Sequence, residues 1–196
     1  MILRMFYTAF LAVGVENLLF SGGVGFSRAL RAAQRRESIG VYALLITWFS
    51  LLSMLFGIWL KPVLPAAYGP KMILRSSYLA AAAVAAYVIT YLLARFLLPI
   101  RFMKKISVFL APAAVNTVVL AMPYVQWYLA LKPEEAIGYA LGTGAAFYLA
   151  SVVLSYAEEK CRNPDIPSSF QGLPALILYI GILSMAFAGF AGSKII

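Results

Sequence analysis

The sequence predicts an all-α integral membrane protein, with six transmembrane helices arranged as two inverted three-helix repeats. Hydrophobic residues make up 63% of the 196 residues and charged residues only 12%. A soluble fold of this length could not bury so much apolar surface. Uncharged stretches of about 20 residues, long enough to cross a bilayer, recur six times along the chain. Two of them contain an asparagine among small residues, 99 positions apart.

The six expected spans are approximately 5–26, 39–60, 74–98, 106–131, 136–157 and 170–193. They occupy nearly the whole chain, which predicts one membrane domain over 1–196 with halves of about 1–100 and 101–196. The first span does not have the pattern of a cleaved signal peptide. Its apolar part continues through Glu16 and Asn17 into a glycine cluster, without a small-residue cleavage site.

Polar interruptions mark the first and fourth spans. Asn17 lies in LAVGVENLLFSG (11–22), and Asn116 lies in LAPAAVNTVVLA (110–121). Apolar helices interrupted at matching places in two halves are typical of inverted repeats, whose half-helices meet near the bilayer midplane. We therefore expect the first and fourth helices to be broken near the midplane, and any function of the chain to lie there.

The distribution of cations predicts the orientation. One side carries ten of the sixteen Lys and Arg residues: Arg28, Arg31, Arg35, Arg36, Arg95, Arg101, Lys104, Lys105, Lys160 and Arg162. The other side carries the remaining six: Arg4, Lys61, Lys71, Arg75, Lys132 and Lys194. Because cytoplasmic loops are enriched in cations, the first side is assigned to the cytoplasm. Both termini then face outward across the cell inner (cytoplasmic) membrane.

The composition also excludes several kinds of site. There is no histidine and one cysteine, Cys161, so the chain can form neither an internal disulfide nor a Cys/His metal set. Cys161 lies in a polar connection and is interpreted as a structural or incidental thiol. The net charge of +9 is spread between hydrophobic runs, so no nucleic-acid partner is expected. The basic segment RALRAAQRRE (28–37) is interpreted as a loop touching anionic lipid, with a docking surface for a soluble partner as the alternative.

The segment LGTGAAFYLASVVLS (141–155) contains two closely spaced glycines, as glycine-rich nucleotide-binding loops do. No strand precedes Gly142 and Gly144 and no Lys-Ser/Thr follows them, so we expect close helix contact there instead. Aromatic residues near the ends of spans fit an interfacial belt: Trp59, Tyr68, Tyr124, Trp127 and Tyr128.

The C-terminal run NPDIPSSFQGLPALILYIGILSMAFAGFAG (163–192) resembles the last loop and helix of a known family of membrane proteins. The members of this family are the A/E-type membrane subunits of Rnf electron-transport complexes and of the Na⁺-translocating NADH:quinone reductase. The matching residues are Asp165, Ile166, Pro167, Phe170, Gly172, Ser184, Ala186, Phe187, Gly189, Phe190 and Gly192, while Gln171 replaces the family's usual cation. The resemblance implies a complex containing a sister six-helix subunit of opposite topology, together with flavin and iron–sulfur subunits.

The sequence departs from that family at the expected cofactor ligands. In the family, a cysteine in each broken helix joins two from the sister subunit to hold a [2Fe–2S] cluster. Here Thr117 follows Asn116 where the family has cysteine, and Ser21, Gly22 and Gly23 occupy the corresponding stretch of the first half. A hydroxyl substitutes poorly for a thiolate, since it would have to ionise in a low-dielectric interior. We therefore expect no cluster, metal ligand or catalytic residue in this chain.

Four residues remain as candidates for an ion path or midplane break: Glu16, Asn17, Asn116 and Thr117. A carboxylate inside an apolar helix is costly unless it is paired, hydrated or protonated. Glu16 can serve a cation or proton path, or Glu16 and Asn17 can simply pair with free backbone groups at the break. The expected function is a scaffold and ion-path subunit of an Rnf/Nqr-like complex. The alternative is a repurposed inverted-repeat transporter or channel for a small solute or ion, independent of redox partners.

Overall fold

The computed structural model describes residues 2–61, 72–97 and 99–190, and every regular element within these ranges is helical. The elements in chain order are α1 (Ile2–Val13), α2 (Phe26–Ala33), the 3-10 turn η1 (Arg36–Ser38), α3 (Ile39–Leu60), α4 (Met72–Leu97), α5 (Ile100–Ala114), α6 (Thr117–Tyr128), α7 (Pro133–Lys160) and α8 (Leu173–Phe190). This confirms the all-helical class. Four residues used in the sequence analysis, Tyr68, Lys71, Gly192 and Lys194, lie outside the described ranges.

Among the described residues, three helices are long and apolar enough to cross a membrane: Arg36–Leu60, Ser76–Leu97 and Pro133–Lys160. The pair Ile106–Ala114 and Thr117–Tyr128, bent by 42°, adds a fourth if the two pieces count as one span. The expected first and last spans appear instead as the shorter apolar helices Ile2–Val13 and Leu173–Gly189. Six spans and a two-fold relation between the halves therefore remain predictions.

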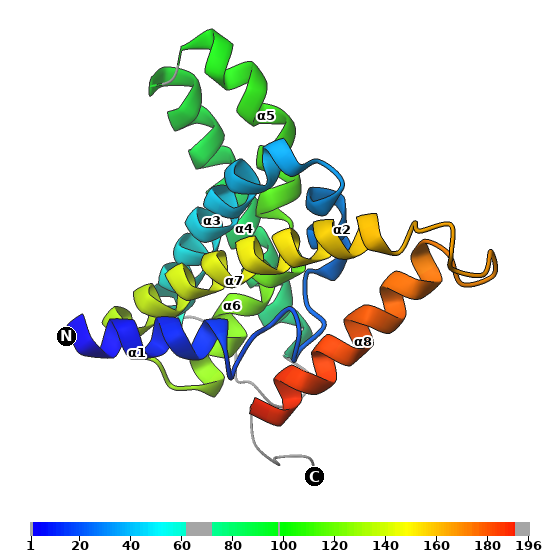
Figure 1. The fold of residues 1–196 in the computed structure, drawn as a ribbon. Coiled ribbons are helices and arrows are strands. Elements are labelled where there is room, and N and C mark those ends of the chain that lie inside the picture. Colours follow the sequence, from blue (N-terminus) through cyan, green and yellow to red (C-terminus); the bar gives the residue numbers. More distant parts are fainter. Residues whose placement is uncertain (1, 62–71, 98, 191–196) are drawn as a thin grey trace.

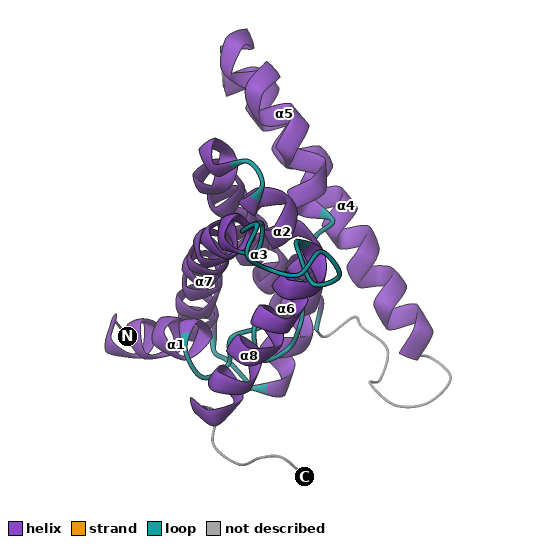
Figure 2. Ribbon diagram, turned by 45° about the vertical axis from the view of Figure 1, so that its right-hand side comes forward, coloured by secondary structure: helices purple, strands orange, loops and turns teal. Residues whose placement is uncertain are grey.

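The long helix α7 lies at the centre of the fold. It packs against α1 on one side and α3 on another, and α6 packs in turn against α3 (Figure 1). The helices α4 and α5 pack against each other and extend away from the rest of the molecule at one end (Figure 2). The helix α8 lies below α7 in Figure 1, and much of its surface is exposed.

Glycines of α7 bring neighbouring helices close. A Cβ added at Gly142 would lie 2.7 Å from Ala9 Cα of α1, and one added at Gly138 would lie 2.7 Å from Met5 Cα. On the side facing α3, a Cβ at Gly144 would overlap the side chain of Thr47. Small residues at such crossings let helix backbones approach closely in membranes. The expectation of helix contact for this stretch is confirmed.

The fold accommodates a proline inside α6. Pro123 has no N–H, so the carbonyl of Val119 loses the hydrogen bond it would receive within a regular helix. The hydroxyl of Ser53, on α3, donates to that carbonyl at 2.7 Å. One turn further along α3, Gly57 leaves room for the proline ring, because a Cβ there would lie 2.9 Å from Pro123 Cβ.

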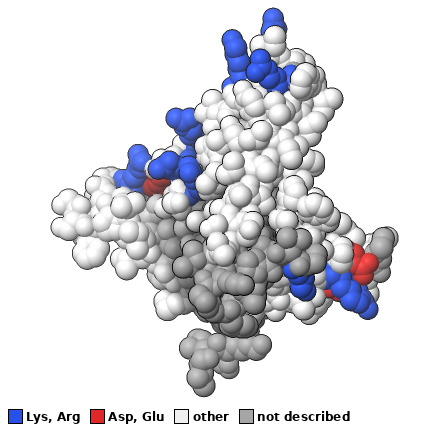
Figure 3. Space-filling model, turned by 180° about the vertical axis from the view of Figure 1, so that it is seen from behind, with Lys and Arg blue, Asp and Glu red and all other residues white. Residues whose placement is uncertain are grey.

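Among the described residues, charged side chains lie near the edges of the face seen in Figure 3, and the described surface between them is uncharged. Large apolar side chains are exposed on several helices, including Leu3 of α1, Phe96 of α4 and Met185 of α8. A water-soluble monomer rarely exposes contiguous apolar surface on this scale. These faces are suited to lipid or to other membrane proteins.

Candidate functional site at two asparagine-capped helix breaks

The first break follows α1, which ends at Val13. Asn17 is 2% exposed, and its Nδ2 donates to the carbonyl of Val13 at 2.8 Å. Its Oδ1 accepts from the backbone N–H groups of Leu19 at 3.0 Å and Phe20 at 3.2 Å. One side chain thus pairs with a carbonyl at the end of α1 and with two amides of the following turn. The chain stays non-helical until Phe26.

The second break separates α5 from α6. Asn116 has extended backbone angles, φ −78° and ψ 138°, and caps α6. Its Oδ1 accepts from the N–H of Val118 at 3.2 Å. The residue is completely buried, yet its Nδ2 has no hydrogen-bond partner among the described residues. In both asparagines the side-chain oxygen accepts hydrogen bonds from backbone N–H groups. The amide nitrogen of Asn17 also donates a hydrogen bond, whereas that of Asn116 has no acceptor among the described residues.

The structure brings the second break against the start of α2. Gly25 caps α2 with a φ of +84°, a conformation that favours glycine. A Cβ at this position would lie 3.3 Å from Asn116 Oδ1 and would overlap the side chain of Val118. The N-terminal ends of α2 and α6 are therefore adjacent. Both ends carry partial positive charge from their free N–H groups.

Glu16 and Thr117 lie at the margins of this site. The side chain of Glu16 is exposed and makes no hydrogen bond or ion pair within the described residues, whereas its backbone carbonyl accepts from the Tyr139 hydroxyl at 3.0 Å. Thr117 is the exposed first residue of α6. Of Glu16 and Asn17, Asn17 is therefore the one whose side chain pairs with backbone groups of the first break within the described residues.

Two residues from other helices contact the first break, and the sequence did not identify either of them. Tyr139 of α7 bonds to Glu16 across 123 positions. Phe187 of α8 stacks on Phe20 of the first break, with ring centroids 4.7 Å apart and planes at 15°. Phe187 belongs to the C-terminal pattern, but nothing in that pattern identifies its contact. The sequence shows a glycine cluster after Asn17, but it does not show that Gly25 contacts Asn116.

Several residues of the C-terminal pattern make hydrogen bonds in the loop before α8. Gly172 has a φ of +79°, and its N–H donates to the carbonyl of Cys161 at 2.8 Å. The amide of Gln171 donates to the carbonyls of Arg162 at 3.2 Å and Asn163 at 3.1 Å. The uncharged side chain of Gln171 therefore pairs with two carbonyls just beyond the end of α7.

The donors at the breaks do not fit an iron–sulfur cluster, which needs four thiolates or a close substitute. Thr117 offers a hydroxyl, and so does Ser21. The single thiol, Cys161, is buried at the C-terminal end of α7. Over the described ranges, no group of three or more His, Cys, Asp or Glu residues could hold a metal ion.

Comparison with known proteins identifies relatives of this chain. The family described as Rnf-Nqr subunit, membrane protein, matches residues 5–193. One relative is an ion-translocating oxidoreductase complex subunit from Buchnera aphidicola subsp. Schizaphis graminum. It is 33% identical over 89 residues, which are 45% of this chain and 46% of the relative.

Two further relatives match to a similar extent. A proton-translocating ferredoxin:NAD(+) oxidoreductase complex subunit from Clostridium ljungdahlii is 31% identical over 86 residues, 44% of this chain and 45% of the relative. An ion-translocating oxidoreductase complex subunit from Rhodobacter capsulatus is 31% identical over 91 residues, with 45% and 46% covered. Each match thus spans a little less than half the length of the relative. Because the family match extends over almost the whole chain, this protein belongs to the Rnf-Nqr subunit family of membrane proteins.

Proposed function

We propose that this chain is a membrane subunit of an Rnf/Nqr-like ion-translocating oxidoreductase complex, acting as scaffold and ion path without an iron–sulfur cluster of its own. Family membership and the relatives, which are subunits of ion- and proton-translocating oxidoreductase complexes, support assignment to such a complex. The observation that carries the ion-path role is the pair of buried, asparagine-capped breaks, one of which meets the start of α2.

The broken helices create helix ends within the protein. α1 and α5 end at the breaks with C-terminal carbonyls, and α6 begins there with free N–H groups. Carbonyl-bearing C-terminal ends attract cations, and N-terminal ends attract anions. Glu16 adds a carboxylate beside the first break. In this proposal the ligands of the cation are the carbonyl oxygens at the ends of α1 and α5 and the Glu16 carboxylate.

Purification tests assignment to a complex. A tag on this chain is expected to recover a sister six-helix subunit of opposite topology, together with flavin and iron–sulfur subunits. Recovery of the chain alone, with solute or ion flux in vesicles that contain only this protein, would instead establish the independent transporter.

The absence of a cluster is tested on the isolated chain. After purification without oxygen, the chain should contain no stoichiometric iron and give no reduced-cluster signal in electron paramagnetic resonance. Two irons per chain would overturn this part of the proposal. A cluster that appears only in the assembled complex would assign its ligands to a partner.

The ion-path role is tested at Glu16. Glu16→Gln keeps the size of the side chain and its capacity to accept hydrogen bonds but removes its charge, so it should lower ion-coupled activity while assembly is retained. The matched control is Glu134→Gln, which removes the same charge in the first turn of α7. Equal activity in both variants would exclude Glu16 from the path.

A further inference from the structure

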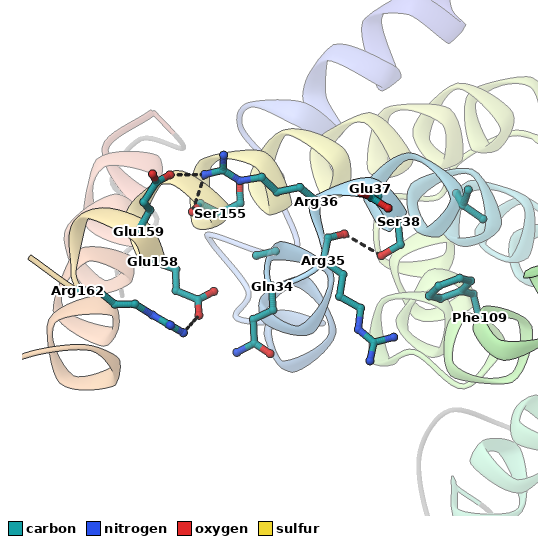
Figure 4. Close-up of a pocket in the computed structure, with 12 residues that line it drawn as sticks. Gln34, Arg35, Arg36, Glu37, Ser38, Phe109, Ser155, Glu158, Glu159 and Arg162 are labelled. Carbon is teal, nitrogen blue, oxygen red and sulfur yellow. Dashed lines mark hydrogen bonds and ion pairs between the residues drawn. The ribbon is translucent and has the colours of Figure 1, made fainter.

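A cleft of about 1080 Å³ opens between the α2–η1 turn, the start of α3, α5 and the end of α7 (Figure 4). Its walls combine charged and apolar side chains. The lining residues that bear on its chemistry are Gln34, Arg35, Glu37, Val41, Phe109 and Arg162.

The cleft lies at one end of two helices that are long enough to cross a membrane. Its wall includes the beginning of the Arg36–Leu60 span and the end of the Pro133–Lys160 span. Residues at the ends of such spans lie at the level of lipid headgroups. This end also carries the cations that the positive-inside rule assigns to the cytoplasmic side, where anionic lipids give the membrane surface its negative potential.

Most of the charge in the cleft is internally paired. Arg36 bonds to Glu159 at 2.5 Å and to the carbonyl of Ser155 at 3.4 Å. Arg162 bonds to Glu158 at 2.7 Å. These pairs use both carboxylates that α7 contributes to the wall.

Arg35 makes no ion pair within the described residues, and neither does Glu37. Figure 4 shows Gln34 and Arg35 extending to the lower side of the view, with Glu37 on the upper side. Arg28 and Arg31 lie in α2, and Arg35 follows the end of that helix by two positions. These three cations outnumber Glu37, which is the one acidic residue of the cleft without an ion pair among the described residues.

The opposite wall is apolar. Phe109 of α5 packs edge-to-face against Tyr42 of α3, with centroids 5.9 Å apart, which fixes its ring beside the cleft. Val41 lines the same region, and Val108 is exposed on the neighbouring surface of α5. A ligand that fits both walls has an anionic head joined directly to an apolar chain.

We propose that this cleft binds the phosphate of an anionic phospholipid. Arg35 and Gln34 donate to the phosphate oxygens, since guanidinium and amide N–H groups match that acceptor geometry. Arg28 and Arg31 raise the local positive potential, and the first part of an acyl chain lies against Phe109 and Val41. An acidic segment of a soluble protein fits less well, because it would leave an apolar wall at membrane depth uncovered. The site is independent of ion translocation.

Lipid titration of the full chain in detergent, read by native mass spectrometry, tests the proposal. Phosphatidylglycerol should bind more tightly than phosphatidylcholine. Arg35→Gln should weaken phosphatidylglycerol binding about fivefold and leave phosphatidylcholine binding unchanged. Glu37→Gln should strengthen phosphatidylglycerol binding. The matched control is Lys61→Gln, which removes one exposed charge at the opposite end of α3 and should change neither lipid.

Three results would overturn the proposal. Equal weakening by Arg35→Gln and Lys61→Gln would show diffuse surface attraction rather than a site. Full displacement of phosphatidylglycerol by equimolar inorganic phosphate would show a site for a free anion. Equal affinity for the two lipids would leave the cleft to an acidic protein partner. Arg35→Lys serves as a second variant, because it keeps the charge but loses the two-pronged geometry, and it should give intermediate binding.

Discussion

Asn17 and Asn116 occupy matching sequence positions but satisfy different numbers of backbone groups. Asn17 pairs with one carbonyl and two amides, because the chain turns without forming a helix after it. Asn116 pairs with one amide, the N–H of Val118 in the first turn of α6. In an interior without water, each group left unpaired costs free energy.

Replacement by leucine should therefore affect the two asparagines unequally. Asn17→Leu leaves three backbone groups without their partner and should destabilise the protein by about 3 kcal/mol, while Asn116→Leu should cost about 1 kcal/mol. Thermal unfolding of the purified chain in detergent measures both. Equal losses would mean that the unpaired Nδ2 of Asn116 has a partner in the membrane.

At the scale of elements, α6 depends on α3 for a bond that its own backbone cannot make. Pro123 removes the N–H that would reach the Val119 carbonyl, and Ser53 supplies a donor from α3 instead. A sequence shows the proline, but it does not show which helix compensates for it. The pairing arises only when α3 and α6 pack together.

A double-mutant cycle isolates this compensation. Ser53→Ala should cost about 1–2 kcal/mol in the native background, because a buried carbonyl loses its donor. In the Pro123→Ala background the restored N–H can reach that carbonyl, so the same change should cost less than about 0.5 kcal/mol. Unfolding free energies of the four proteins give the coupling. The same cost in both backgrounds would exclude this role for Ser53.

The contact between α1 and α7 depends on backbone proximity. Gly142 lies against the backbone of Ala9, and Thr8 Oγ1 donates to the carbonyl of Glu135 at 2.9 Å across the same interface. A side chain larger than hydrogen at Gly142 would force the two helices apart.

Gly142→Ala should therefore destabilise the protein by about 1–3 kcal/mol, as overpacking does in a dense interior. The control is Gly181→Ala in α8, where a Cβ would meet no heavy atom within 4 Å. That change should be neutral or stabilising by up to about 1 kcal/mol, because alanine favours the helix. Melting temperatures compare the two variants, and a neutral Gly142→Ala would contradict the close approach.

At the scale of the whole molecule, the cations separate into two groups with uncharged helices between them. Lys104 lies in α5, near the α4–α5 connection, and Lys132 lies at the N-terminal end of α7. The larger group predicts which end faces the cytoplasm. A thiol reagent that cannot cross the bilayer reports the side of each residue directly.

The orientation is tested with single cysteines placed in a Cys161→Ser background. In intact cells the impermeant reagent should label Lys132→Cys and leave Lys104→Cys unlabelled, and both should react after the membrane is permeabilised. Labelling of Lys104→Cys alone would invert the topology and place both termini in the cytoplasm.

Local composition was sufficient to predict the helical membrane class, interruptions at Asn17 and Asn116, and the approximate bounds of α3, α4 and α7, but not α2 or the end of α1 at Val13. The expected span 39–60 coincides with α3, and 136–157 lies within α7. These properties follow from hydrophobic length and from residues that interrupt a helix, both of which act between near neighbours in sequence. The extent of the first break, twelve residues rather than a short kink, was not predicted, because Tyr139 and Phe187 contact it from other helices.

Tertiary structure alone decided which groups meet at the site. The contact of Gly25 with Asn116, the bond from Ser53 to Val119 and the cleft beside Arg35 each join residues from different helices. A single sequence carries no record of these pairs, since each exists only after the helices have packed. The sequence determines which backbone groups lack a local partner, and packing determines which distant side chain provides it.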